Sequence, residues 1–282
     1  MGLKKACKIG IKLGALTLLY YLGSTIVSLM IGLGQDQQPA NPGRVAVIAL
    51  LVSFLSVAAI SYPVMRSKWT GWRLVLTVFI VLFGIRTFLS QIETIVFLRY
   101  LKDIIPADMV PLLIVEGFVT AAFFAPLCVL VLGKFKPHTA VSQSMGVMGN
   151  KELAVRLVLI GLVYVLIYIG FGMFVFRPLA GSAFDQFYTN LHLPRWIIPF
   201  QVLRGILWGL LALPVIRMMR GEFWEKGLAV ALLFSVIMGS LLLIPSDFMP
   251  ERIRLAHFVE LITSNFVFGW LVAWLLTKKR GK

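Results

Sequence analysis

Long apolar stretches alternate with short polar or charged segments along the whole chain. A helix that rises about 1.5 Å per residue needs about 20 mainly apolar residues to cross the hydrocarbon core of a bilayer. Eight stretches meet this length, at roughly 10–33, 45–65, 71–97, 108–133, 154–176, 196–216, 224–245 and 254–277. The pattern therefore predicts an all-α, polytopic membrane bundle of about eight transmembrane helices.

The composition agrees with this pattern. Hydrophobic residues fill 59% of the 282 positions, charged residues fill only 14%, and the mean hydropathy is +0.91. Soluble domains are about 45–50% apolar and about 25% charged. One soluble core cannot cover this much apolar surface, so the composition argues against a soluble enzyme, a disordered chain and a disulfide-rich scaffold.

The charged residues are mostly basic, with 27 Lys and Arg against 12 Asp and Glu and a formal net charge of +15. Of the 27, 18 fall on the side of the predicted spans that holds the N-terminus, in segments 4–12, 66–73, 134–156, 217–226 and 278–282, and 7 fall on the other side. Cytoplasmic loops carry such an excess. We therefore expect both termini in the cytoplasm of a bacterial or archaeal cell, with membrane lipids rather than nucleic acid as partners of this charge.

The sequence also shows signs of an internal duplication. Three pairs of segments match in chain order: Lys12 and Tyr20 with Arg156 and Tyr164, 115–120 with 259–264, and 63–66 with 214–217. The first and second matches share a shift of 144 residues, and the third is shifted by 151. Because each unit would hold four spans, both units enter the membrane from the same side. We therefore predict two parallel repeats, 1–133 and 153–282, related by a pseudo-twofold axis along the membrane normal and joined by a cytoplasmic linker, 134–152.

Five ionisable side chains lie inside the predicted spans: Arg86, Glu93, Glu116, Arg204 and Glu260. Such groups are costly in hydrocarbon and usually face a bundle interior or a wet cavity. Together with Gln201, His257 and Asn265 they occupy the half of the bundle away from the N-terminus, which predicts one polar, ligand-binding cavity open to the outside. We expect pairings such as Arg204 with Glu260, or Arg86 with Glu116.

A purely structural role remains open for each of these residues, because buried ion pairs also lock helices in register. His257 lies near the membrane interface with no evident metal partner, and Gln201 and Asn265 are typical helix–helix hydrogen-bonding residues. The outer loop 177–195 is open to two interpretations, a lid over the cavity or a short interfacial helix.

Several kinds of chemistry lack their motifs in this sequence. A phosphate-binding GxxxxGK[ST] or GxGxxG loop, HExxH, GxSxG and metal-ligand cysteine spacing are all absent. We therefore expect no cofactor and no metal site, and the sequence favours a protein without enzymatic activity over an enzyme.

Three functions remain from this reading. The first is a transporter or channel-like protein for a small solute or ion, in which the carboxylates handle protons or ions. The second is a non-catalytic subunit or assembly factor of a larger membrane complex, which meets its membrane-protein partners through lateral helix faces. The third is a membrane-embedded enzyme that acts on a lipid headgroup, with Arg86 and Arg204 on the phosphate and Glu116 or Glu260 as acid or base.

Overall fold

The computed structural model describes residues 2–33, 41–101, 106, 108–136, 148–189, 193–246 and 248–277. These residues form helices and one isolated antiparallel bridge, between Ser67 and Met219. Eight helical segments among them are long and apolar enough to cross a membrane. The prediction of an all-α chain with about eight spans is thus confirmed, and the chain has the architecture of an integral membrane protein.

The first four spans are α1 (Leu3–Ile31), α2 (Pro42–Met65), the stack of α3 (Gly71–Phe83), η1 (Gly84–Phe88) and α4 (Leu89–Leu101), and α5 (Met109–Val131). The next four are the stack of α6 (Asn150–Phe171), η2 (Gly172–Phe176) and α7 (Arg177–Ala180), then α9 (Ile197–Met218), the stack of α10 (Phe223–Leu232), η3 (Leu233–Ile237) and η4 (Ser240–Leu243), and α11 (Glu251–Thr277). The short helix α8 (Ser182–Phe187) follows α7. The segments η1, η2 and η3 are π-helical, and η4 is a 3-10 turn.

Two helices begin well before their apolar stretches. α1 starts at Leu3 rather than near residue 10, and α6 starts at Asn150 rather than near residue 154. The added residues include lysines and Glu152, which are good helix formers in water. Hydropathy marks the part of a helix that lies in hydrocarbon, and the hydrogen-bonded helix continues beyond it. Most of the predicted linker, residues 137–147, lies outside the described residues.

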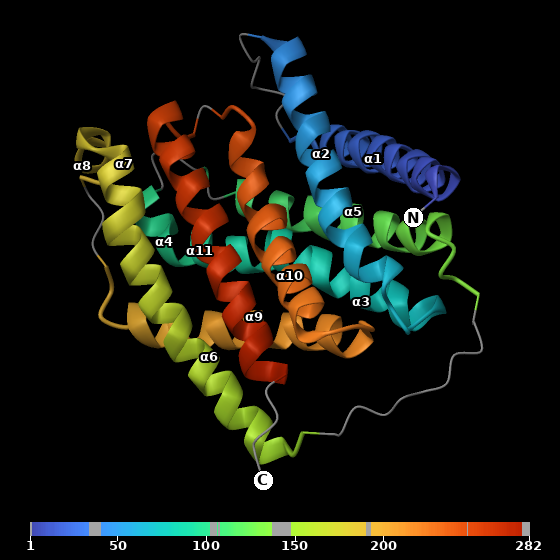
Figure 1. The fold of residues 1–282 in the computed structure, drawn as a ribbon. Helices are drawn as coiled ribbons and strands as arrows, with labels where there is room; N and C mark the ends of the chain where they lie inside the picture. Colours follow the sequence, from blue (N-terminus) through green and yellow to red (C-terminus); the bar gives the residue numbers. More distant parts are fainter. Residues whose placement is uncertain are drawn as a thin grey trace.

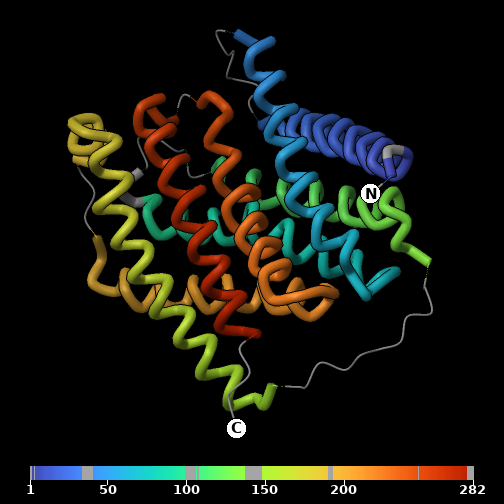
Figure 2. Tube along the Cα trace, viewed as in Figure 1, coloured from blue at the N-terminus to red at the C-terminus, as the bar shows by residue number. Residues whose placement is uncertain are grey.

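The spans form two crossed layers (Figures 1 and 2). One layer contains α6, α11, α10 and α2 in that order, and the other contains α1, α5, α3 with α4, and α9. Helix α2 thus lies beside helices from the second half of the chain, and α9 lies beside helices from the first half. The two layers share one packing order. In it, α6, α11, α10 and α2 of one layer correspond to α1, α5, α3 and α9 of the other.

Small residues allow α6 and α9 to cross at close range. A Cβ added to Gly205 would lie 2.7 Å from Gly161 Cα, and one added to Gly161 would lie 2.6 Å from the Val202 carbonyl oxygen. Such close backbone approach is typical of membrane helix pairs. The sequence contains a second small-residue spacing, Gly10-x-x-x-Gly14, but both of these glycines face open space, so that spacing makes no helix contact.

The ends of α2 and α9 meet at one end of the bundle. The Lys68 amide donates to the Met218 carbonyl at 2.8 Å, and the Arg220 amide donates to the Arg66 carbonyl at 3.0 Å. An ion pair between Arg66 and Glu225, at the start of α10, reinforces this junction. The reciprocal bonds tie the two layers together at this end.

Two lysines beside this junction are partly desolvated. The Lys134 ammonium donates to the Ser67 carbonyl at 3.0 Å. Burial lowers the pKa of Lys134, and the nearby Arg220 charge lowers it further. Burial also lowers the pKa of Lys68, with further lowering from neighbouring cations. The basic residues at this end therefore lie close enough to repel one another electrostatically.

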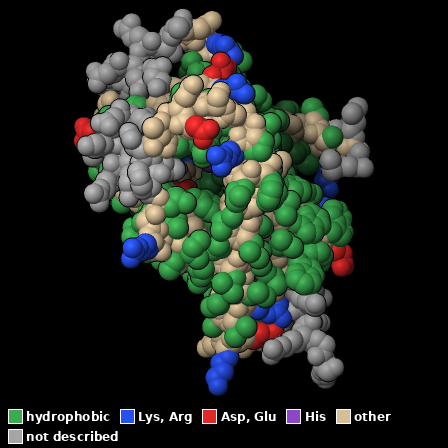
Figure 3. Space-filling view, turned by 90° about the vertical axis from the view of Figure 1, so that its left-hand side faces the viewer, with side chains coloured by type: hydrophobic (Ala, Val, Ile, Leu, Met, Phe, Trp, Pro, Cys, Tyr) green, Lys and Arg blue, Asp and Glu red, His purple; other side chains and the backbone are tan. Residues whose placement is uncertain are grey.

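Apolar side chains dominate the lateral surface. Figure 3 shows a face whose middle is covered by hydrophobic side chains and whose charged side chains gather toward its two ends. On α6 and η2, for example, Leu166 and Phe174 are 72% and 79% exposed. An apolar band between charged rims is the surface that a bilayer solvates.

Candidate functional site

The predicted site residues do not converge on one point; the structure divides most of them between two clusters. The Arg86 cluster comprises Tyr20, Arg86, Glu116 and Thr120 from α1, η1 and α5. The Arg204 cluster comprises Glu93, Gln201, Arg204 and Tyr164 from α4, α9 and α6.

In the Arg86 cluster a guanidinium bridges a tyrosine and a carboxylate. Arg86 Nη2 lies 3.4 Å from Glu116 Oε1, and Arg86 Nη1 donates to the Tyr20 hydroxyl. The guanidinium carbon also lies 5.4 Å from the centroid of the Tyr20 ring. Thr120 Oγ1, one turn after Glu116, donates to the same carboxylate oxygen at 3.0 Å. The predicted pairing of Arg86 with Glu116 is thus present.

The Arg86 side chain projects from a π-helical segment. A π-turn inserts one extra residue into a helix and rotates everything that follows, and such turns are frequent at functional sites. Arg86 and Glu93 would share a face in a regular α-helix, at positions i and i+7. Across η1 they instead join different clusters, since Arg86 reaches Glu116 and Glu93 reaches Arg204.

The Arg204 cluster is the more deeply buried of the two. The Arg204 side chain is 1% exposed, and its Nη1 lies 2.7 Å from Glu93 Oε1. The same guanidinium donates to Gln201 Oε1 at 3.0 Å and to the Leu89 carbonyl at 3.1 Å, and it lies 5.6 Å from the Tyr164 ring centroid. Its Nε has no hydrogen-bond partner among the described residues. One buried donor is therefore left unsatisfied.

Glu260 is not the partner of Arg204, contrary to the pairing proposed from the sequence. Helix α9 packs beside the α3–η1–α4 stack, which brings Glu93 rather than Glu260 to the guanidinium. Glu260 Oε2 instead lies 3.0 Å from His257 Nδ1, and Ser264 Oγ donates to Glu260 Oε1 at 3.3 Å. His257 therefore has a carboxylate neighbour, as its position one helical turn before Glu260 allows.

Asn265 stands apart from these groups. Its amide contacts Met238 Sδ at 3.9 Å, and no hydrogen bond of the described residues joins it to either cluster. Its environment fits the helix-packing role that the sequence left open.

Tyrosines and hydroxyl side chains complete the two clusters. The tyrosines were not among the predicted ligand-binding residues. Tyr20 packs against Phe124 with ring centroids 4.7 Å apart, and Tyr164 packs against Phe268 at 5.0 Å. The two tyrosines are 144 positions apart, as are the two phenylalanines and the glutamates Glu116 and Glu260. The match between the segments around Tyr20 and Tyr164 was the signal in the sequence that pointed to them.

A further buried arginine lies outside the predicted set of site residues. Arg254, near the start of α11, is 5% exposed and donates to the Leu242 carbonyl at 2.5 Å. This hydrogen bond links η4 to α11, so Arg254 has a structural role.

The segment after η2 folds as two short helices, α7 and α8, and both pack against α11. The Tyr188 ring at the end of α8 contacts the rings of Phe176, Phe184 and Phe187. Burial, together with the smaller effect of the negative charges of Glu93 and Glu260, raises the pKa of Tyr188 to about 12. Tyr188 therefore lies within electrostatic range of both carboxylates.

No group of three or more His, Cys, Asp or Glu side chains that could hold a metal ion occurs in the described part of the chain. The polar groups are instead arranged as two charge-compensated clusters and one glutamate–histidine pair. No protein-family model, curated protein or solved structure matches this chain.

Proposed function

We propose that the chain arose by duplication of a four-helix unit, with halves 1–133 and 153–282 as the parallel repeats. The shared packing order of the two layers supports this origin. So do the π-helical segments η1 and η3, which occupy the third span of each half. The reciprocal bonds at the Ser67–Met219 bridge are those expected of equivalent segments that meet at a twofold axis.

The placement of the basic residues supports the orientation in which the junction of α2 and α9 faces the cytoplasm. Arg66, Lys68, Lys134, Arg220 and Lys226 gather at this end. The beginning of α1 shares a pocket with Met65 at the end of α2, and Trp270 in α11 contacts Phe223 at the start of α10, so we place both termini on this side. By the positive-inside rule this side is cytoplasmic, in a bacterial or archaeal membrane.

We infer that the protein is a transporter for a small solute or ion, in which intramembrane carboxylates handle protons or ions. One observation carries this inference: each half buries one glutamate at the equivalent position, with a hydroxyl donor one turn later. These are Glu116 with Thr120, and Glu260 with Ser264. Intramembrane carboxylates are costly and mark ion and proton pathways.

The two glutamates have different neighbours, which suggests a division of roles. Glu116 is paired with the fixed charge of Arg86, an arrangement that suits a structural anchor. Glu260 has a histidine beside it, whose charge depends on its proton. We therefore assign the exchange of a proton or cation to Glu260 and His257, and helix anchoring to Glu116.

The unsatisfied Nε of Arg204 adds support for a bound polar species in the Arg204 cluster. A buried donor without a partner costs about 1–3 kcal/mol, so it is a place where water or a polar solute gains by binding. The alternative of a lipid-headgroup enzyme is less favoured, because the guanidiniums of Arg86 and Arg204 are already engaged with carboxylates.

The test is flux into proteoliposomes that contain a pH-sensitive dye. A potassium diffusion potential is imposed, and proton and ²²Na⁺ uptake are measured alone and with a panel of amino acids, sugars and organic acids. We expect uptake with wild type and with Glu251→Gln, a matched control on the same helix α11 at an exposed position. Glu260→Gln abolishes it, whereas Glu116→Gln mainly lowers thermal stability.

Full flux through Glu260→Gln would show that the glutamate is not on the pathway. Absence of flux from wild type for every probe, together with reduced stability of Glu260→Gln, would favour a structural role for the buried charges.

A further inference from the structure

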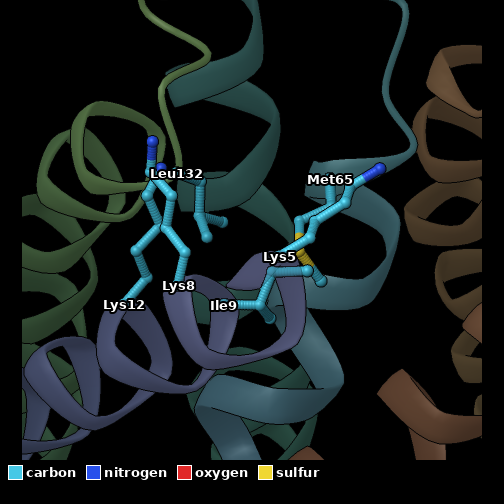
Figure 4. Close-up of a pocket in the computed structure, with 6 residues that line it drawn as sticks. All are labelled: Lys5, Lys8, Ile9, Lys12, Met65 and Leu132. Carbon is cyan, nitrogen blue, oxygen red and sulfur yellow. The ribbon is translucent and has the colours of Figure 1, made fainter. Parts of the chain in front are cut away.

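A small pocket opens between the beginning of α1 and the ends of α2 and α5 (Figure 4). It encloses about 180 Å³ and is lined by Lys5, Lys8, Ile9, Lys12, Met65 and Leu132. The ammonium groups of Lys8 and Lys12 lie together beside Leu132, and Lys5 extends past Met65 (Figure 4). The pocket therefore combines apolar walls with a basic rim, and no acidic residue lines it.

The charges at this rim are not compensated within the described part of the chain. Lys8 and Lys12 are one helical turn apart, where like charges repel. The first turn of α1 contains no acidic residue. No ion pair formed by the described residues includes Lys5, Lys8 or Lys12. An anion that binds at the rim would relieve this repulsion.

The second half of the chain handles the equivalent positions differently. Glu152 and Arg156 occur 144 residues after Lys8 and Lys12. They form an ion pair at 2.5 Å, and Arg156 also donates to the Leu275 carbonyl. The Glu152 carboxylate, which pairs with Arg156 in the second half, therefore has no equivalent at the start of α1.

We propose that this pocket binds the phosphodiester group of an anionic phospholipid from the surrounding bilayer. Basic pockets beside transmembrane helices recognise such headgroups. The volume suits a phosphodiester but not acyl chains, and α1 offers those chains an apolar outer face, on which Ile11 and Leu18 are 68% and 54% exposed. A free phosphate ion would gain nothing from this apolar face. The proposal goes beyond transport and does not depend on it.

The test counts phosphatidylglycerol molecules that stay bound when the protein is released from mixed phosphatidylglycerol–phosphatidylcholine nanodiscs in a native mass spectrometer. The decisive variant is Lys8→Glu, which introduces at this position the residue type found at Glu152. Its matched control is Lys4→Glu, an exposed position on the same helix that does not line the pocket and has the same change in charge.

We expect one retained phosphatidylglycerol per chain for wild type and for Lys4→Glu. Each lysine near a membrane surface is worth about 1 kcal/mol toward anionic lipid, so replacing attraction by repulsion in Lys8→Glu weakens retention by roughly thirtyfold. Lys8→Gln falls between the two, which separates a graded loss of affinity from a failure to fold.

Three outcomes would overturn the proposal. Equal loss in Lys4→Glu and Lys8→Glu would reveal diffuse surface attraction rather than a site. Equal retention of phosphatidylcholine would show that the headgroup charge is not recognised. Displacement of the lipid by inorganic phosphate would identify a site for free phosphate instead.

Discussion

Variants that break the ion pair between Glu93 and Arg204 are the strongest single test of how the buried charges are arranged. We consider the variants Glu93→Gln and Arg204→Met and their combination. The guanidinium is 1% exposed and the carboxylate is 30% exposed, and their closest atoms are 2.7 Å apart. The two ends of the pair are therefore buried to very different degrees.

This asymmetry determines the expected magnitudes. Glu93→Gln leaves a fully buried guanidinium without its counter-charge, and breaking a buried pair in this way costs about 3–5 kcal/mol. Arg204→Met leaves a carboxylate that is only partly buried, so its cost is smaller, about 1–3 kcal/mol. The double variant has neither orphaned charge and loses less than the sum of the single variants, by about 2 kcal/mol or more.

The assay is reversible unfolding in mixed micelles with increasing sodium dodecyl sulfate, followed by tryptophan fluorescence. We expect Glu93→Gln to be less stable than Arg204→Met, and the double variant to be more stable than Glu93→Gln. Additive losses, within about 0.5 kcal/mol, would show that the two groups are not coupled. The reverse order of the single variants would refute the assigned burial.

Three further predictions concern other parts of the bundle. A Cβ at Gly117 would lie 1.9 Å from Thr87 Oγ1, so Gly117→Ala should lower the free energy of unfolding by about 1–3 kcal/mol, whereas Gly10→Ala, in open space, should not lower it. The folded chain raises the pKa of Tyr188 to about 12, so above a pH of about 10 the unfolded chain loses this proton first. The melting temperature should therefore fall as the pH rises from about 10 to about 12, and Tyr188→Phe should make this fall less steep. An unchanged slope in Tyr188→Phe would count against the assigned burial. Glu225→Ala should lose both an ion pair and a hydrogen bond to the helix N-terminus, whereas Glu225→Gln keeps an acceptor for the latter, so the alanine variant should melt lower; equal melting temperatures would contradict this division.

The fold class and number of spans were predictable from hydropathy, because about 20 apolar residues are needed wherever a helix crosses hydrocarbon. The ends of the helices were not, since Lys4 and Lys151 lie in helices that continue into water. Part of the candidate site was predictable as well. The pairing of Arg86 with Glu116 was expected, and the 144-residue match pointed to Tyr20 and Tyr164 without revealing that guanidiniums lie against their rings.

The partner of Arg204 could not be predicted, for a physical reason. A regular helical period places Arg86 and Glu93 on one face, but the π-segment η1 adds a residue and turns Glu93 toward α9. Local π-geometry depends on how neighbouring helices pack, and the hydrophobic pattern contains no sign of it. The proximity of His257 to Glu260, in contrast, follows from one turn of α11 and could be predicted from the sequence.

The sequence by itself determined that this chain has eight apolar spans and which of its polar groups lie within them, because the cost of exposing polar groups to hydrocarbon depends on composition and length alone. Only the tertiary structure decided how the spans form two crossed layers and which charges neutralise one another. It also left one hydrogen-bond donor unsatisfied, at the Nε of Arg204, and left the lysine charges in the pocket of α1 without an ion-pair partner among the described residues. Those outcomes depend on distances of a few ångströms between segments far apart in the chain, and Coulombic and hydrogen-bond energies are set at that scale.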